Sequence, residues 1–418
     1  MGARKSSRRS LRFALSCLLI IGIYVAIGFG LREPLEPIRI GALHSLTGTM
    51  ASSEIQEVET LRALVAATNR QGGLLGRPLE LIIADGASDP SIFARHAESL
   101  IKEQAVSVIF GCWLSSARKA VKPVIERYDS LLMYPAQHEG LERSEHIIYA
   151  GATPNQQLFP SLIWAQQTFG NKLFLVGSDY VYPKSLNLIT RILAPKIGLE
   201  VINERYLDLV DHDAAKALAE EIVLSGADFV LNSINGDGNE AFFRAMDQIY
   251  GTKPNKPLPA VISLSLDENA ARSLPNLQGH SYLSWSYIYN PEHWIQPNDP
   301  VIADALSHEL SGYPISATMA ATIISYTLWR TAVEHIGTPQ PRAVNASIRN
   351  RGIRLLGGHI FADPETGHLY QFSQIAAHQN RIPLPIVWES DSVIPPEPYP
   401  LGFSVTEWER MLHKAKAE

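Results

Sequence analysis

The chain has 418 residues, of which 46 % are hydrophobic and 19 % are charged, so it is long enough for two globular domains. Its formal net charge of −6 is unevenly spread, because residues 1–32 hold six Lys or Arg and no acid, which leaves −12 on the rest. A body this acidic is a poor nucleic-acid binder, and we therefore expect no nucleic-acid partner.

The N-terminal 32 residues are predicted to be a targeting segment. Five positive charges precede residues 13–31, an apolar run without charge. This pattern is typical of either a cleaved signal peptide or an uncleaved membrane anchor, and Arg8-Arg9 also resembles a twin-arginine signal. Basic residues on the N-terminal flank place the body in the periplasm or on the extracytoplasmic face of the inner membrane in both cases.

From residue 38 onward, short apolar runs alternate with segments of helical periodicity. The first half predicts strands at 38–43, 78–84, 106–110 and 131–134, with helices at 54–69, 91–102 and 117–128. We expect Ile55, Val58, Leu61 and Val65 to form the inner face of the first helix, and Ala120, Val121, Val124 and Ile125 that of the third.

The alternation restarts after residues 149–157 and ends in a different pattern. Strands are predicted at 173–177, 200–206, 227–232 and 259–264, followed by mainly helical residues 301–351, a hairpin addition at 357–388 and a tail with a short helix near its end. This order predicts an α/β fold with doubly wound parallel sheets in two similar units.

Polar and aromatic side chains gather where the predicted strands end. Open parallel sheets bind ligands beyond the carboxyl ends of their strands, and the first unit delivers Trp113, Ser115, Tyr134, Gln137 and His138 there. The second unit delivers Tyr180 and Tyr182, together with the loop Asn235 to Asn239. These residues predict a small aromatic site with hydroxyl and amide groups, suited to a compact polar ligand.

Simpler interpretations exist for the same residues. Trp113 and Tyr134 could be core aromatics, and Ser45, Thr47 and Ser115 are ordinary turn or N-cap residues. Ser115 and Ser116 stand where a helix N-cap is expected. A cap and a ligand role are compatible, because a helix N-terminus presents free N–H groups to a bound carbonyl.

Enzyme signatures are missing from the sequence. It contains no G-x-S-x-G, Walker, G-x-G-x-x-G, H-E-x-x-H or C-x-x-C motif. Ser115, His138 and Glu139 are the residue types of a catalytic triad, but such residues are common. We expect no catalytic residue, no metal site and no cofactor.

Seven segments carry a family resemblance in chain order. They are HSLTGTMASSE from His44, DGASD from Asp85, GCWLSSARKAV from Gly111, YPAQHEGLE from Tyr134, TPNQQ from Thr153, GSDYVYP from Gly177 and NGDGNEAFF from Asn235. They span nearly the whole body. The chain resembles the type I periplasmic binding proteins, specifically the branch with urea-binding proteins of ABC transporters and short-chain amide sensors.

The resemblance implies two Rossmann-like lobes, joined by three crossovers, that close on a ligand like a hinged clamp. Lobe 1 would comprise residues 38–150 and 286–355, lobe 2 residues 151–285 and 356–395, and residues 396–418 a C-terminal tail. By analogy, Trp113 and Tyr134 wall the pocket, Ser115 hydrogen-bonds the ligand, and Tyr180 and Tyr182 close over it. Gln137 is a further candidate ligand-binding residue. Weaker candidates, placed by loop position, are Ser45, Asn235 and Ser265.

One departure from the family concerns the ligand. Ala136 replaces a larger or hydroxylated residue of some relatives, which enlarges the pocket or removes a hydrogen bond and leaves room for a small amide. We therefore expect a binding protein that delivers urea or a short-chain amide to ABC permease subunits. Neutral Ser, Tyr and Asn partners would satisfy such a ligand without burying a charge. The alternative is a sensor subunit, anchored through residues 13–31, that reports occupancy to a regulatory partner.

Overall fold

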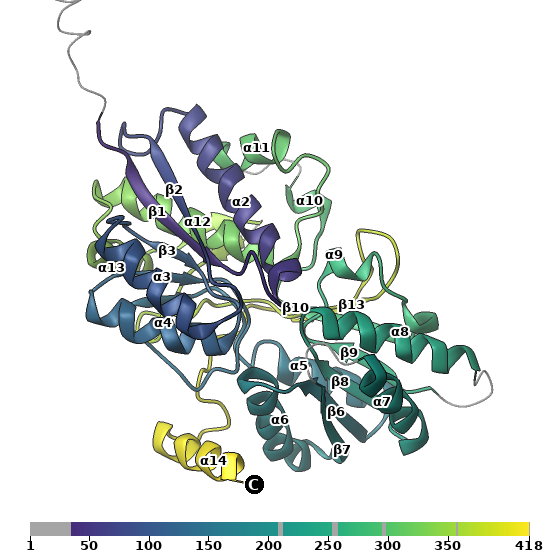
Figure 1. Cartoon of the computed structure of the whole chain (residues 1–418). Coiled ribbons are helices and arrows are strands. Elements are labelled where there is room, and N and C mark those ends of the chain that lie inside the picture. The colour runs from purple at the N-terminus through teal and green to yellow at the C-terminus, as the bar shows by residue number, and fades with distance from the viewer. Residues whose placement is uncertain (1–34, 208–211, 253–257, 295–297, 357, 418) are drawn as a thin grey trace, which may run out of the picture.

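The computed structural model describes residues 35–207, 212–252, 258–294, 298–356 and 358–417, and it contains two α/β lobes, each built on its own sheet (Figure 1). The predicted α/β class is thereby confirmed. The predicted targeting segment lies outside the described residues. Within the described part of the chain, no helix combines the length and the apolar character needed to cross a bilayer.

The sheet of the first lobe has the order β2-β1-β3-β4-β5, with every neighbouring pair parallel. Helices cover both of its faces, because apolar residues of α3 and α4 pack on one side and those of α2, α11, α12 and α13 on the other. The elements are β1 (Ile38–His44), α2 (Ala51–Arg70), β2 (Leu79–Asp85), α3 (Pro90–Lys102), β3 (Ile109–Gly111), α4 (Ser115–Arg127), β4 (Leu132–Tyr134), β5 (Ile147–Tyr149), α11 (Pro300–Ser307), α12 (Ala317–Ile336) and α13 (Pro341–Asn350).

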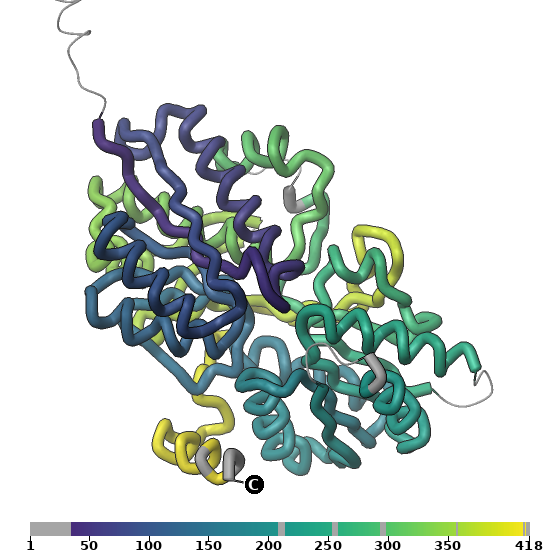
Figure 2. The backbone as a smooth tube through the Cα atoms, viewed as in Figure 1, coloured from purple at the N-terminus to yellow at the C-terminus, as the bar shows by residue number. Residues whose placement is uncertain are grey.

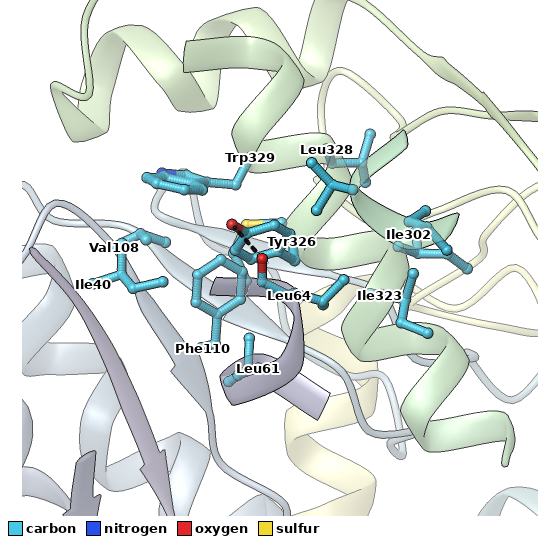
Figure 3. Close-up of a cluster of buried hydrophobic side chains, with 14 of the residues drawn as sticks. Ile40, Leu61, Leu64, Val108, Phe110, Ile302, Ile323, Tyr326, Leu328 and Trp329 are labelled. Carbon is cyan, nitrogen blue, oxygen red and sulfur yellow. Dashed lines mark hydrogen bonds between the residues drawn. The ribbon is translucent and has the colours of Figure 1, made fainter. Parts of the chain in front are cut away.

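An aromatic group joins this sheet to α12. Phe110 on β3 points toward Tyr326 and Trp329 of α12, and each of these rings lies with its centroid 6.0 Å from that of Phe110 (Figure 3). The Tyr326 hydroxyl donates to the carbonyl oxygen of Leu64 in α2 at 3.4 Å. The three segments are far apart in sequence, so this group closes the core of the first lobe.

The sheet of the second lobe has the order β14-β13-β10-β9-β8-β6-β7. Strands β6 to β10 are parallel, whereas β13 and β14 add an antiparallel edge. The elements are α5 (Leu158–Phe169), β6 (Lys172–Ser178), α6 (Val181–Leu193), η1 (Ala194–Ile197), β7 (Glu200–Leu207), α7 (His212–Ser225), β8 (Phe229–Ser233), α8 (Asp237–Thr252), β9 (Ala260–Ser263), α9 (Glu268–Ala271), η2 (Leu277–Gly279), β10 (Ser281–Trp285), α10 (Pro291–Trp294), β13 (Gln374–Ala377) and β14 (Ile386–Glu389).

The chain passes between the lobes after β5, after β10 and before β13. The third passage lies later than the predicted boundary at residue 355, because β11 (Ile353–Leu355) pairs with β12 (Gly358–Ile360) in a hairpin. Ile360, Ala362 and Leu369 then pack in the core of the first lobe. The boundary prediction divided this hairpin, whereas its packing keeps it whole.

Each of the two predicted inner helix faces is confirmed at three of its four residues and wrong at one, and in both helices charged side chains are buried that the prediction left out. In α2, Ile55 is 50 % exposed, whereas Glu54 and Glu57 are buried. In α4, Ala120 is only half-buried, whereas Arg118 is fully buried. Hydrophobic periodicity favours burying the apolar residue, but the inner faces of these helices meet polar groups at the lobe boundary.

The C-terminal tail contains the predicted helix, which is longer than expected and packs on the body. Its helix α14 (Val405–Ala417) lies outside both sheets (Figure 2), but Trp408 packs in a core cluster of the second lobe and is 1 % exposed. The indole Nε1 donates to the carbonyl oxygen of Pro400 at 3.1 Å, and its ring meets Phe403 edge to face. Trp408, with the partly buried Met411, thus holds this helix to the body.

We expect Trp408→Ala to destabilise the protein by about 3 kcal/mol, because it removes a fully buried aromatic group. Limited proteolysis should then cut first within residues 400–417. The control is Val405→Ala on the same helix, where the side chain is 38 % exposed and the melting temperature should barely change. Equal melting temperatures for the two variants would contradict the docked position of the helix.

Candidate functional site

The lobes are hydrogen-bonded to each other where their parallel strands end. The Gln56 amide nitrogen in α2 donates to Asp267 Oδ2 at 2.8 Å, and the Asn269 amide nitrogen donates back to Gln56 Oε1 at 2.8 Å. Nearby, Ser52 Oγ donates to Asp237 Oδ1 at 3.3 Å. These contacts join the start of α2 to the loops of the second lobe, so the structure represents a closed arrangement.

A cavity of about 330 Å³ lies between the lobes at this place. Of the predicted site residues, Trp113 and Ser265 line it. Asp237 and Asn239, which also line it, belong to the loop that the sequence placed at the strand ends. The remaining polar lining residues were not predicted, and most of them lie at the starts of helices that the sequence alone does not bring together: Ser52, Ser53, Gln56, Glu240, Asp267, Asn269 and Ser273.

The backbone after β3 sets the position of Trp113. Gly111 has φ +153°, and a Cβ atom there would lie 2.0 Å from the carbonyl oxygen of Leu43 in the neighbouring strand. Only glycine allows this approach, after which the chain turns and brings Trp113 to the cavity. The Tyr134 hydroxyl donates to the carbonyl oxygen of Trp113 at 2.9 Å, and Tyr134 itself is fully buried. Tyr134 therefore supports the wall of the cavity from behind.

Ser115 has a different local role from the predicted one. Leu114 is the N-cap of α4 and makes no side-chain cap, whereas Ser115 is the first helical residue. Its hydroxyl donates to Glu139 Oε2 at 2.5 Å and accepts a hydrogen bond from Arg118 at 3.2 Å. The Ser115 proton is therefore committed to a carboxylate, which leaves one lone pair as its free hydrogen-bonding capacity.

A buried charge network surrounds Ser115. The Arg118 guanidinium, with no exposed surface, lies 3.0 Å from a carboxylate oxygen of Glu139 and 3.0 Å from one of Glu142. It also lies 4.9 Å from the centroid of the Tyr134 ring. Burial raises the pKa of Glu139, but the charges of Arg118 and Lys119 outweigh it and hold that pKa below its ordinary value. Buried charges therefore lie behind the wall of the cavity, which the sequence did not predict.

His138 takes part in a stack of rings beside this network. Its Nε2 lies 3.1 Å from Nε2 of His368, and the Tyr149 ring stacks on His368 at 4.1 Å between centroids. Burial lowers the pKa of His138 well below its ordinary value, so the imidazole is neutral. Since Ser115 bonds directly to Glu139 and not to His138, the residue types of a triad do not form one here.

Gln137 and Tyr182 meet the lobe boundary from opposite sides. Gln137 Nε2 donates across it to the carbonyl oxygen of Leu264 at 3.2 Å, while its Oε1 is buried and has no partner. The Tyr182 hydroxyl is likewise buried and unpartnered. Burial raises the pKa of Tyr182, and the Gln137 amide is near enough to lower it in part. The two groups nevertheless form no hydrogen bond of normal geometry.

Tyr180 packs against core clusters of both lobes. It is the backbone N-cap of α6, and Tyr182 lies in the first turn of that helix. Both positions belong to the strand end and helix start that the sequence indicated. The tyrosines therefore reach the first lobe from the second.

Of the predicted site residues, only Trp113 and Ser265 line the interlobe cavity, and three that have not yet been described, Ser45, Asn235 and Ala136, lie outside it as well. The Ser45 hydroxyl accepts from the backbone N–H of Ser88, and the Asn235 amide nitrogen donates to the carbonyl oxygen of Ser233. Ala136 is 2 % exposed, and its carbonyl oxygen faces Gly151, where a Cβ atom would lie 1.8 Å away. These residues shape the loops around the cavity.

We expect Arg118→Ala to destabilise the protein by about 3–5 kcal/mol, because two buried carboxylates would lose their counter-charge. The measurement is thermal unfolding followed by circular dichroism. Lys119→Ala is the matched control, since Lys119 also contacts Glu139 but its side chain is 39 % exposed, and its effect should stay below about 1 kcal/mol. Similar losses for both variants would contradict the central role of Arg118.

Glu268 gives a prediction on pH. Its carboxylate accepts from the backbone N–H groups of Tyr289 and Ala317, but burial and then the charge of Asp267 raise its pKa to about 7. The folded state thus holds a proton that the unfolded chain, with an ordinary pKa of 4.5, has released. The stabilisation is complete below pH 4.5 and is lost as the pH rises to about 7, by on the order of 3 kcal/mol.

In Glu268→Gln this titration is absent. We therefore expect the melting temperature of the variant to rise relative to the wild type between pH 4.5 and 8, whatever the offset at pH 4.5. A difference that stays constant over this range would contradict the raised pKa.

Comparison with known proteins agrees with this architecture. Residues 38–404 match the family model of the periplasmic binding protein domain. A solute-binding protein of an ABC transporter from R. palustris, in complex with 4-hydroxybenzoate, is 19 % identical with a TM-score of 0.71, covering 88 % of this chain and 100 % of that one.

Two further structures are similar in fold. An ABC transporter substrate-binding protein from Aeropyrum pernix is 16 % identical with a TM-score of 0.75, covering 89 % of this chain and 98 % of that one. A branched-chain amino acid transporter substrate-binding protein from Streptococcus pneumoniae, in complex with isoleucine, is 14 % identical with a TM-score of 0.68, covering 86 % and 100 %. The predicted type I fold and periplasmic location are confirmed. The chain belongs to the periplasmic binding protein domain family, whose members are ligand carriers and not enzymes.

Proposed function

We propose that this protein captures urea or a short-chain amide between its lobes and delivers it to an ABC importer. The observation that carries the proposal is the pair of buried, unpartnered polar atoms at the lobe boundary, Gln137 Oε1 from the first lobe and the Tyr182 hydroxyl from the second. A buried polar atom without a partner destabilises the empty closed state, and a ligand that supplies the partner reverses this cost.

The chemistry of the two atoms suits an amide. Gln137 Oε1 can only accept a hydrogen bond, which an amide N–H supplies, and the Tyr182 hydroxyl can donate to the amide carbonyl. Trp113 in the wall of the interlobe cavity and Tyr180, which packs against the core cluster of Tyr182, offer aromatic surface to a planar molecule. A ligand bound here would contact both lobes and thereby favour closure.

The charges around the cavity favour this ligand class over carboxylates. Its lining includes Asp237, Glu240 and Asp267, and no Lys or Arg is among the described residues that line it. The structural relatives named above carry a benzoate and an amino acid. A carboxylate would face like charges in this cavity, whereas urea and acetamide carry no charge. ABC transporter proteins among those relatives support the importer as partner.

The test is a calorimetric titration of the full chain with urea, acetamide, formamide and thiourea, alongside isoleucine and 4-hydroxybenzoate. Urea must stay at about 1 mM or below, far from the concentrations that unfold proteins. We expect binding of urea or a small amide, with a matching rise in melting temperature. Binding of isoleucine or 4-hydroxybenzoate alone would contradict the ligand class.

We expect Tyr182→Phe to weaken binding of that ligand by about tenfold or more, since it removes one hydrogen bond to a buried polar group. The fold should be unaffected, because the hydroxyl has no protein partner to lose. The control is Tyr206→Phe on β7, the edge strand of the second sheet. The Tyr206 hydroxyl bonds to Glu204 of the same strand and to Asn187 of α6. Unchanged affinity in Tyr182→Phe would contradict the proposed contact.

A further inference from the structure

The unpartnered buried atoms near the lobe boundary are mostly hydrogen-bond acceptors. Besides Gln137 Oε1, they include both carboxylate oxygens of Glu57 and Oε1 of Glu54. His44 Nε2, His138 Nδ1 and the hydroxyls of Tyr182 and Ser286 are also buried without a partner, and each of them can either donate or accept. The protein thus brings several acceptors together without the matching donors, and a ligand rich in N–H groups would supply them.

Glu57 has the greatest unmet need for hydrogen-bond donors or a positive charge. Its side chain has no exposed surface, and neither of its oxygens makes a hydrogen bond of normal geometry. The Thr318 hydroxyl is near enough to lower its pKa in part, but the charged groups that act on it, Asp267 and Glu54, are both acidic. A buried carboxylate normally has a cationic partner, and here the protein provides none among these neighbours.

Glu57 has neighbours at both cavities of the lobe boundary. Of its neighbours, Asp267 lines the 330 Å³ cavity, and Thr318 lines a second, small cavity of about 20 Å³ together with Gln137. Gln56 connects them, because its amide nitrogen donates to Asp267 Oδ2 at 2.8 Å and to Thr318 Oγ1 at 3.3 Å. The unpartnered carboxylate therefore lies next to residues that line the region of the proposed ligand.

From these contacts we infer that the site takes a small planar cation of the guanidinium or amidinium type, with the Glu57 carboxylate as its counter-charge. This rests on the proposed interlobe site and extends its ligand class from neutral amides to their positively charged relatives of the same shape. Guanidinium has the planar form of urea but presents N–H donors on all three sides and no acceptor. Protonation of Glu57 would remove its charge but provide only one donor for several unpartnered acceptors.

The test compares neutral and charged molecules of equal shape on the full chain. Guanidinium chloride and urea form one pair, and acetamidinium chloride and acetamide the other, each at about 1 mM or below with ionic strength matched by sodium chloride. Calorimetry should show each cation binding at least about tenfold more tightly than its neutral counterpart. Glu57→Gln should reduce cation affinity at least about tenfold and urea affinity less than threefold.

Two controls keep loss of folding apart from loss of the charge. Glu57→Gln removes a buried charge and keeps the shape, so its melting temperature should equal or exceed that of the wild type. Glu59→Gln is the same substitution two residues further along α2, where the side chain is 60 % exposed, and it should leave the affinity for either cation unchanged.

The possible results separate this inference from the proposed function. If urea or acetamide binds and the cations bind no better, the inference is wrong and the proposed function stands. If the cations bind and neither neutral molecule does, the inference stands and the neutral ligand class is wrong. Cation binding that is unaffected in Glu57→Gln would overturn the assigned counter-charge, and binding of none of the four would overturn both.

Discussion

The ion pairs of Arg118 with Glu139 and Glu142 are the interaction on which the binding region of the first lobe depends. Arg118 comes from α4, and the two carboxylates come from the loop after β4, so one buried guanidinium fixes that loop against the helix. Ser115 bonds to both Arg118 and Glu139, and the Tyr134 ring lies against the guanidinium. Tyr134 in turn holds the backbone of Trp113. Breaking this network would leave buried charges unpaired and release the wall of the cavity.

The two halves of the boundary differ in electrostatic character. Behind Ser115, positive and negative charges compensate each other inside the protein. At the start of α2, by contrast, Glu57 lies near Glu54 and Asp267 of the second lobe, and burial raises the pKa of Glu57 well above its ordinary value. The first region gives a rigid wall, and the second retains a need for positive charge or N–H donors. Under the proposed function, a ligand would be selected on the second of these two sides, where buried polar groups have no partner.

Amide side chains tie the segments that pass between the lobes. Gln157 Nε2 donates to the carbonyl oxygens of Leu264 and Ser284 in the second lobe, at 3.1 and 2.6 Å. Gln156 Nε2 bonds to the carbonyl oxygen of Leu369, and Gln371 Nε2 to that of Ala150, so separate passages are joined to each other. These bonds hold the passages together at the lobe boundary. The polar segment from Thr153 to Gln157 is explained by this role.

The sequence by itself determined the alternation of strands and helices, and with it the two sheets and the strand ends at which polar and aromatic residues gather. Buried strands and amphipathic helices are local patterns, so Trp113, Tyr180 and Tyr182 could be placed near the lobe boundary from the sequence. Periodicity failed at Glu54, Glu57 and Arg118, because hydrophobic patterns assign charged residues to the surface. Only the tertiary structure decided which of them are buried and with what partners, since each partner comes from a distant segment. The same reason explains Gln56 and Asp267, which become neighbours only when the lobes meet.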